Sequence, residues 1–160
     1  MRRTNLPAIP TDQEVNDKLE KIENEVLGHI SFKELIKEVS LADIPIAHQH
    51  NLEELHRKIN LVREAWGQPM VVTSGYRTTQ DQLRIYRSRG VPDKKIPMAS
   101  HHLSGGACDI LDEDGKLMEW VRLNEALMIE VGLWIEDDSS QPRVHFQVAP
   151  PKSGKRFFKP

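Results

Sequence analysis

Residues 98–110 read MASHHLSGGACDI, and one charged residue of this stretch lies where a buried strand is expected. Asp109 stands between Cys108 and Ile110, in a short apolar run that is typical of a strand inside a core. An isolated buried carboxylate is too costly in free energy to keep, so such a group is paired or bound to a cation. The stretch therefore predicts a partner for Asp109, and the preceding pair His101 and His102 supplies the first candidates.

A second segment with a histidine, RVHFQV at residues 143–148, is predicted to be a strand. Side chains alternate between the two faces of an extended segment, so Val144 and Phe146 share one face and His145 lies on the other. In GACDIL the same alternation sets Asp109 apart from its two apolar neighbours. Asp109 and His145 can therefore meet if the two strands are neighbours in a sheet.

The Ser-Gly-Gly turn between His102 and Asp109 can fold the chain back, so that both side chains point to one place. Two imidazoles and one carboxylate suit Zn²⁺, with an open position for water. The alternative is that Asp109 bonds to backbone groups or to an arginine while the histidines lie on the surface. His101 could replace His102 in another register, but adjacent side chains point apart, so only one of the two would bind the metal.

The rest of the chain has the pattern of an α+β protein, with a small antiparallel sheet and helices packed on it. Helical periodicity with capping signals covers residues 11–28, 31–40, 51–66, 78–90 and 116–132. Strands are predicted at residues 69–74, 106–111, 133–136 and 143–148, and an irregular tail at residues 150–160. We expect one globular domain overall, in which residues 1–50 form an N-terminal helical extension packed on residues 51–160.

Composition narrows the classes of partner. The 160 residues carry 22 Lys and Arg against 24 Asp and Glu, a formal charge of −2, which lacks the basic field that nucleic-acid binding needs. No apolar run approaches the roughly 18 residues of a membrane span, so we expect no membrane insertion. No apolar segment follows the N-terminal arginines, so we expect cytoplasmic synthesis without a signal peptide, and we expect a monomer.

Cys108 is the only cysteine, which excludes an internal disulfide and favours a buried structural thiol. His48 and His50 could form a second metal site in an extended segment, although a surface position is the favoured interpretation.

Three landmarks in order resemble a known family. SHHLSGGACD at residues 100–109 fits the pattern S-x-H-x-x-G-x-A-x-D, VVTSGYRT at residues 71–78 holds a strand followed by Ser-Gly-Tyr-Arg, and RVHFQV is a late strand with a histidine. Together they resemble the zinc D-Ala-D-Ala carboxypeptidase and dipeptidase family, peptidase family M15, which includes phage endolysins that cut peptidoglycan cross-links. The resemblance runs from about Asn51 to Val148.

The resemblance implies one zinc ion and a set of residues around it. The implied ligands are His102, Asp109 and His145. The residues implied to contact the carbonyl or carboxylate of the substrate are Arg77, Ser100 and Tyr76.

The chain departs from the family pattern at one position. Many members place an acid three residues before the last histidine, whereas this chain has Pro142 there. The nearest acids upstream are Glu136, Asp137 and Asp138. Glu136 ends the predicted strand LWIE, so a hairpin can return His145 beside it, and we predict that Glu136 is the catalytic base.

The leading interpretation is thus a zinc peptidase that hydrolyses peptidoglycan stem peptides containing D-alanine or meso-diamino acids, as a carboxypeptidase or as an endopeptidase. An endolysin-like protein made in the cytoplasm would act at the cell wall after release. Two alternatives stay open: a non-catalytic zinc-binding module of the same fold, and a metal-free phage or prophage accessory protein.

Overall fold

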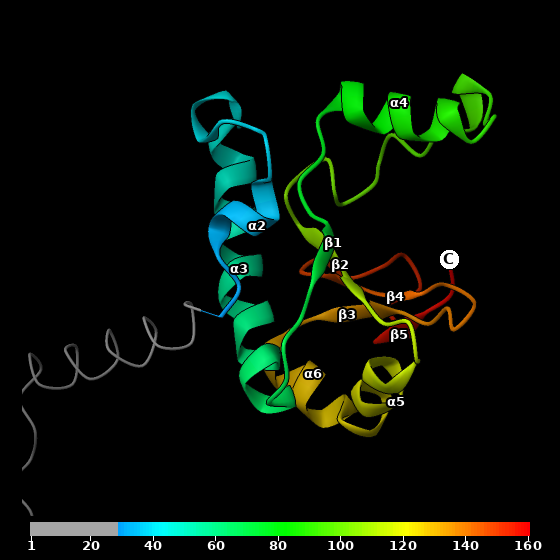
Figure 1. Cartoon of the computed structure of the whole chain (residues 1–160). Coiled ribbons are helices and arrows are strands. Elements are labelled where there is room, and N and C mark those ends of the chain that lie inside the picture. The colour runs from blue at the N-terminus through cyan, green and yellow to red at the C-terminus, as the bar shows by residue number, and fades with distance from the viewer. Residues whose placement is uncertain (1–28) are drawn as a thin grey trace, which may run out of the picture.

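The computed structural model in Figure 1 describes residues 29–160, so the helix predicted over residues 11–28 lies outside the described residues. The elements in chain order are α2 (Phe32–Ile36), the 3-10 helix η1 (Leu41–Asp43), α3 (Ile46–Trp66), β1 (Val72–Ser74), α4 (Thr79–Ser88), the 3-10 helix η2 (Asp93–Lys95), β2 (Ala107–Leu111), α5 (Lys116–Leu123), α6 (Glu125–Val131), β3 (Trp134–Glu136), β4 (Arg143–Gln147) and β5 (Phe157–Phe158). Within residues 29–160, five α-helices around a small sheet confirm the predicted α+β class.

The strands form one five-stranded sheet in the order β1-β2-β4-β3-β5. β2 runs antiparallel to β1 on one side and to β4 on the other, and β4 runs antiparallel to β3. The pairing of β3 with β5 at the far edge is parallel. The predicted antiparallel sheet is therefore correct for β1 to β4, and β2 and β4, which carry the residues of interest, are central neighbours.

The core lies between one face of the sheet and the helices. Cys108 and Ile110 of β2 and Val144 and Phe146 of β4 are almost completely buried in it. The helices contribute Leu35 from α2, Leu52, Leu55, Ile59 and Val62 from α3, Leu117, Met118 and Val121 from α5, and Met128 from α6. Because side chains alternate along a strand, the residues between these apolar positions face the other side of the sheet, where the candidate site lies.

The third helix begins earlier than predicted. α3 begins at Ile46, directly after Pro45, whereas the capping signal at Asn51 lies inside the helix. The boundary that we drew at residue 50 therefore falls within a continuous helix. His48 and His50 are helical, and two residues of a helix that are two positions apart do not face each other, so the second metal site suggested for them is wrong.

Among the described helices, none combines the length and the apolar character that a membrane span needs.

The single helix predicted over residues 116–132 is two helices, α5 and α6, which meet at Asn124. The side-chain amide of Asn124 donates to the carbonyl oxygen of Trp120 at 2.8 Å, and its backbone N–H donates to the same carbonyl. An asparagine that competes in this way for helix carbonyls ends a helix. The apolar periodicity continues across the break, which is why the sequence shows one helix.

The tail predicted to be irregular contains β5. Phe157 and Phe158 pair with Ile135 and Glu136 of β3, and Phe157 packs against the core. Two residues are too few to show a strand pattern in the sequence. The pairing covers the outer edge of β3 and so helps to hold Glu136 in place.

Candidate metal centre

The pairing of β2 with β4 brings Asp109 and His145 together. The two residues are direct partners in the antiparallel ladder, on the face of the sheet opposite to the core. Nδ1 of His145 lies 2.8 Å from Oδ1 of Asp109. The meeting of these side chains, predicted from alternation in two short strands, is confirmed.

The loop before β2 returns His102 to the same point. Gly105 has a φ of +81°, in the left-handed region that favours glycine, and a Cβ atom there would lie 2.6 Å from the backbone oxygen of His48. The N–H of Gly106 closes the turn by donating to the carbonyl oxygen of His101 at 2.9 Å. Nε2 of His102 then lies 3.4 Å from Oδ1 of Asp109.

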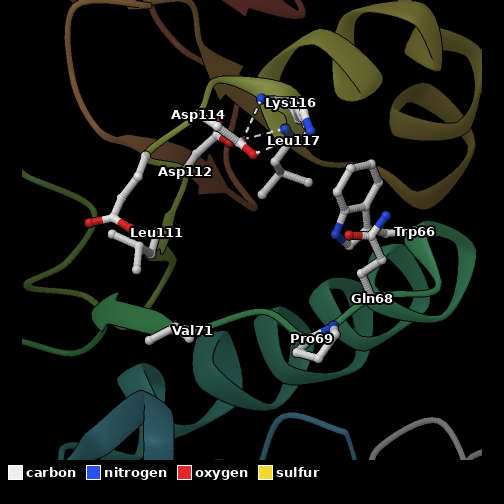
Figure 2. A pocket seen from close by; sticks show the side chains of 10 residues that line it. Trp66, Gln68, Pro69, Val71, Leu111, Asp112, Asp114, Lys116 and Leu117 are labelled. Atoms are coloured by element: carbon white, nitrogen blue, oxygen red, sulfur yellow. Dashed lines mark hydrogen bonds and ion pairs between the residues drawn. The ribbon is translucent and has the colours of Figure 1, made fainter.

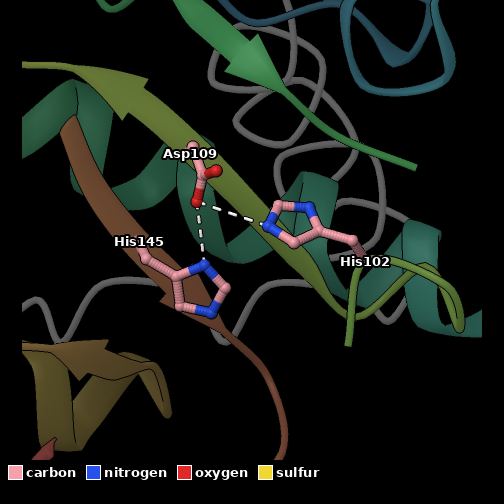
Figure 3. A group of neighbouring side chains, drawn as sticks. All are labelled: His102, Asp109 and His145. Atoms are coloured by element: carbon pink, nitrogen blue, oxygen red, sulfur yellow. Dashed lines mark hydrogen bonds and ion pairs between the residues drawn. The ribbon is translucent and has the colours of Figure 1, made fainter. Parts of the chain in front are cut away.

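Figure 3 shows that the two imidazoles approach the same carboxylate oxygen from the loop and from β4. One donor atom from each of the three residues lies within 4.8 Å of the others. Zinc bonds of about 2.0–2.2 Å place tetrahedral donors roughly 3.4 Å apart, so this group can hold a metal ion with small adjustments. The side chains of His102 and Asp109 are 5% and 2% exposed, and that of His145 is 11% exposed, so an ion bound there would retain one accessible side.

Burial and hydrogen bonding set the protonation of this group. Burial by itself would raise the pKa of Asp109, but hydrogen bonds to His102 and His145 outweigh it and hold the pKa well below its usual range. For His102, burial dominates and lowers the pKa below its usual value, although Asp109 opposes this. An ionised carboxylate beside a neutral imidazole is the form in which both groups bind a metal ion.

Hydrogen bonds behind the histidines determine which ring nitrogens face the centre. Nδ1 of His102 donates to the carbonyl oxygen of Gly75 at 2.8 Å, which leaves Nε2 directed at Asp109. Nε2 of His145 donates to Oε1 of Gln147 at 3.0 Å, and the amide of Gln147 is itself oriented by donating to the carbonyl oxygen of Ala149 at 2.9 Å. Nε2 of His102 and Nδ1 of His145, which lie against Asp109, are therefore the nitrogens that would bind a metal ion in place of their protons.

The second oxygen of Asp109 contacts two arginines. Nε of Arg143 donates to Oδ2 at 3.2 Å, and an Nη of Arg77 lies 3.9 Å from it. Arg77 is held by Ser74, which accepts from its Nε at 3.0 Å, and by Gln82, which accepts from its Nη1 at 3.1 Å. The guanidinium of Arg77 thus has a fixed orientation beside the carboxylate of Asp109, with one terminal nitrogen directed toward it.

The three residues lie at the wall of a cavity of about 490 Å³. Glu136, Arg77 and Ser100 also line it. Ile135 pairs with Phe146 and is buried in the core, so the side chain of Glu136, the next residue of β3, lies on the opposite face of the sheet, which is the face of His145. The cavity therefore combines a group that can hold a metal ion, a carboxylate and a fixed guanidinium.

The comparison with protein families agrees with this geometry. The family model described as Peptidase M15 matches residues 28–137, which is more than half of the chain. This chain belongs to the peptidase M15 family. The matched residues include His102 and Asp109 and end before His145, whose place beside them follows from the strand register.

M15 peptidases are metallopeptidases, and the site described above has the donors that this activity needs. Among solved structures, an L-Ala-D-Glu endopeptidase, ChiX, from Serratia marcescens is similar with a TM-score of 0.47 and 20% sequence identity, over 72% of this chain and 100% of that chain. A search among curated proteins found no match.

The structure brings the residues predicted for an M15 site to one cavity, with one exception. Tyr76 does not line the cavity, because its hydroxyl lies 3.1 Å from Nδ1 of His48 on α3 and adjacent residues of the loop point apart. His101, the alternative ligand, is not one of the three grouped donors, and Asp138, another acid near the predicted base, lines a neighbouring pocket. Ser100 lines the cavity, and its Oγ accepts from the N–H of His102 at 3.4 Å.

Sequence reasoning missed the residues that surround the donors. Alternation along β4 places Arg143 and Gln147 on the face of His145, but no signal in the sequence indicates the hydrogen bonds that they make to Asp109 and His145. Arg89 lines the cavity and Gln82 orients Arg77, but both lie on or at the end of α4, and no local pattern indicates which side of that helix meets the sheet.

Another pocket, of about 320 Å³, lies at the end of β2 (Figure 2). It has acidic residues in its wall, but these serve α5: Asp112 accepts from the backbone N–H groups of Leu117 and Met118, each at 3.0 Å, and Asp114 accepts from that of Lys116 at 3.1 Å. These carboxylates satisfy the N–H groups at the start of a helix, which is a structural role.

Proposed function

We propose that this M15 peptidase is a zinc-dependent hydrolase of peptide bonds in peptidoglycan stem peptides. The observation that carries the proposal is the convergence of His102, Asp109 and His145 in a cavity that also holds Glu136 and Arg77. Because this substrate lies in the cell wall, the proposal includes action there after release of the protein from the cytoplasm.

Zinc fits the donors of this site. Two imidazoles and one carboxylate are the donors of many catalytic zinc sites, which keep a further position for water. His102 and His145 would bind through Nε2 and Nδ1, since their other nitrogens donate to Gly75 and Gln147. A bound zinc ion supplies an acidified water and polarises the scissile carbonyl.

Glu136 is the proposed general base. It reaches the cavity from β3, on the same face of the sheet as His145, and its pairing with Phe158 of β5 fixes its backbone. Pro142, which has no acidic side chain, lines the cavity at the position where the family pattern has an acid. A carboxylate on the neighbouring strand can take the proton of the attacking water in place of the missing one, and can return it to the leaving amine.

Arg77 is the proposed electrophilic partner. Its guanidinium is held by Ser74 and Gln82, so no reorganisation is needed when charge develops on the substrate. A fixed guanidinium can stabilise the oxyanion of the scissile carbonyl or grip a carboxylate of the substrate. Ser100, on the same cavity wall, can donate a hydrogen bond to the substrate backbone.

Replacing Glu136 by Gln tests the proposal. The zinc content of purified protein and the cleavage of soluble muropeptides would be measured for wild type, for Glu136→Gln and for Asp138→Asn as a matched control that removes an acid outside the cavity. We expect zinc in all three proteins, and a loss of cleavage by a factor of about 10²–10⁴ in Glu136→Gln only.

The same experiment separates the proposal from a non-catalytic zinc-binding module, which Pro142 favours. If wild type holds stoichiometric zinc and cuts neither muropeptides nor D-Ala-D-Ala peptides, the protein is such a module. If cleavage survives removal of zinc by a chelator, the metallopeptidase mechanism is wrong. Return of activity on adding zinc back to the chelated protein would support it.

A further inference from the structure

The two-residue strand β5 contributes one side chain to each face of the sheet. Phe157 pairs with Ile135 of β3 and packs against the core. Phe158, the next residue, pairs with Glu136. Because neighbouring side chains of a strand point to opposite faces, Phe158 lies on the face that carries Glu136 and His145. The strand therefore brings an aromatic ring to the side of the candidate metal centre.

The ring of Phe158 meets the imidazole of His145. The two ring centres are 6.3 Å apart and the ring planes are inclined by 89°, which is an edge-to-face contact. The imidazole of His102 makes a further edge contact with His145, with ring centres 5.1 Å apart. The nitrogens of His145 have Asp109 and Gln147 as partners. Phe158 thus adds an apolar contact to an imidazole whose polar atoms are already engaged.

Phe158 acts on the centre indirectly. It does not belong to the described residues that form the wall of the cavity, so a substrate held there would not touch it. An edge-to-face pair stabilises one relative orientation of its two rings. An imidazole whose orientation is set before a metal ion binds loses less freedom on binding, and outer partners of metal ligands supply such orientation. The contact with Phe158 therefore favours the orientation in which Nδ1 of His145 faces Asp109.

Specific contacts hold β5 against β3, although the strand is short. The backbone N–H of Ile135 donates to the carbonyl oxygen of Arg156 at 2.9 Å, and that of Asp137 donates to the carbonyl oxygen of Phe158 at 2.7 Å. These two bonds lie on either side of the proposed base. The guanidinium of Arg156, directly before β5, lies 3.7 Å from the centre of the Trp134 ring, a cation–π contact. The ring that β5 presents to the centre thus has a defined position.

We propose that Phe158 is a positioning residue of the metal centre, whose ring holds the imidazole of His145 in the orientation that binds zinc. The inference rests on the proposed function, because it concerns the same centre. The matched family model ends at residue 137, so β5 lies outside the matched residues. The aromatic wall of the centre is therefore a feature read from the fold of this chain.

The test compares the two residues of β5. Phe158→Leu removes the ring at the centre and keeps an apolar side chain, whereas Phe158→Tyr keeps the ring. Phe157→Leu is the matched control, because it makes the same change on the core face of the same strand. Three quantities would be measured in wild type and in each variant: the C–H resonances of the His145 imidazole in zinc-free protein, the zinc dissociation constant, and kcat and KM for soluble muropeptides.

We expect the His145 resonances to move in Phe158→Leu, because the ring current of Phe158 is lost, and to stay in place in Phe157→Leu. Zinc should bind about 2- to 10-fold more weakly in Phe158→Leu, the factor to which the energy of an aromatic pair corresponds. The kcat of the zinc-loaded variant should fall while KM stays within about twofold of wild type, since Phe158 does not line the cavity. Phe158→Tyr should behave as wild type in all three measurements.

Unchanged resonances and zinc affinity in Phe158→Leu, in a wild type that binds zinc and cleaves muropeptides, would overturn the inference and leave the proposed function intact. An equal loss of zinc affinity in Phe157→Leu would also overturn it, because the packing of β5 and not the ring at the centre would then be responsible. A loss in Phe158→Tyr as large as in Phe158→Leu would count against the ring in the same way. If wild type binds zinc and cleaves no peptide, the proposed function fails, and the resonances and the zinc affinity still decide the role of Phe158.

Discussion

Replacement of Gln147 by Met tests whether the hydrogen bond behind His145 prepares the metal centre. Gln147 is 4% exposed, accepts from Nε2 of His145 at 3.0 Å and donates to the carbonyl oxygen of Ala149 at 2.9 Å. Methionine has a similar length and volume, so the variant should keep the packing while removing both hydrogen bonds.

The expected effect is on zinc affinity. Loss of the acceptor leaves the His145 ring free to rotate or to carry its proton on Nδ1, the nitrogen that faces Asp109. Removing an outer hydrogen-bond partner of a metal ligand typically lowers affinity by about 10–100-fold. The loss of the contact to Ala149 should cost only about 1 kcal/mol in the free energy of unfolding.

Zinc dissociation constants would be measured by competition with a chromophoric chelator, and thermal unfolding of the zinc-free proteins would be recorded separately. The control is Gln141→Met, which changes an exposed glutamine in the wall of the same cavity that contacts none of the three donors. We expect weaker zinc binding in Gln147→Met only. An affinity within about twofold of wild type, in a protein that folds normally, would refute the role given to Gln147.

Three further outcomes follow from the contacts of the site. His102→Ala and His145→Ala should each abolish stoichiometric zinc binding, as measured by elemental analysis after dialysis, and unchanged zinc content would exclude this centre. Arg77→Gln should lower kcat/KM by about 10²–10³ without loss of zinc, because its guanidinium is held close to the reacting group. Gly75→Ala should lower the free energy of unfolding by about 2–4 kcal/mol in denaturant titrations, since its Cβ would collide with the backbone oxygen of Leu35. Gly106→Ala is the control and should cost much less, because its Cβ would approach a side-chain methyl of Val148 at 3.2 Å.

The meeting of Asp109 with His145 was predictable because it depends on alternation within two short strands. Cys108 and Ile110 are apolar, so the face that Asp109 must avoid is set by its own neighbours. The same holds for His145 between Val144 and Phe146. Only the pairing of the two strands had to be assumed, and the buried carboxylate itself indicated it.

The position of Tyr76 was not predictable, because it depends on contacts far away in the chain. After β1 the N–H of Tyr76 donates to the carbonyl oxygen of Leu35 at 2.7 Å, and that of Arg77 donates to the carbonyl oxygen of His102 at 3.0 Å. These bonds fix the turn so that Arg77 faces the cavity and Tyr76 faces His48. The sequence alone shows that Tyr76 and Arg77 are both suited to contact a substrate. The hydrogen bonds to Leu35 and to His102 determine that Arg77, and not Tyr76, lies in the cavity.

The elements that were misplaced depend on single side chains or on very short pairings. Pro45 moves the start of α3 forward, and Asn124 divides one amphipathic pattern into two helices. β5 consists of two residues whose pairing with β3 has no local signal. For α3 and for the pair α5 and α6 the apolar pattern was correct, and a single proline or asparagine set the boundary.

Asp109 has both histidine and arginine partners, because a carboxylate has two oxygens. The alternative in which the histidines lie on the surface is wrong for His102, which is buried against Asp109. Oδ1 faces the imidazoles of His102 and His145, and Oδ2 faces the guanidinium groups of Arg143 and Arg77. One oxygen therefore belongs to the metal side of the site, and the other orients the arginines that border the cavity. The group that can hold a metal ion and the guanidinium groups at the cavity are thus joined by one carboxylate, and loss of the hydrogen bond from Arg143 would leave more negative charge on Asp109 for a bound cation.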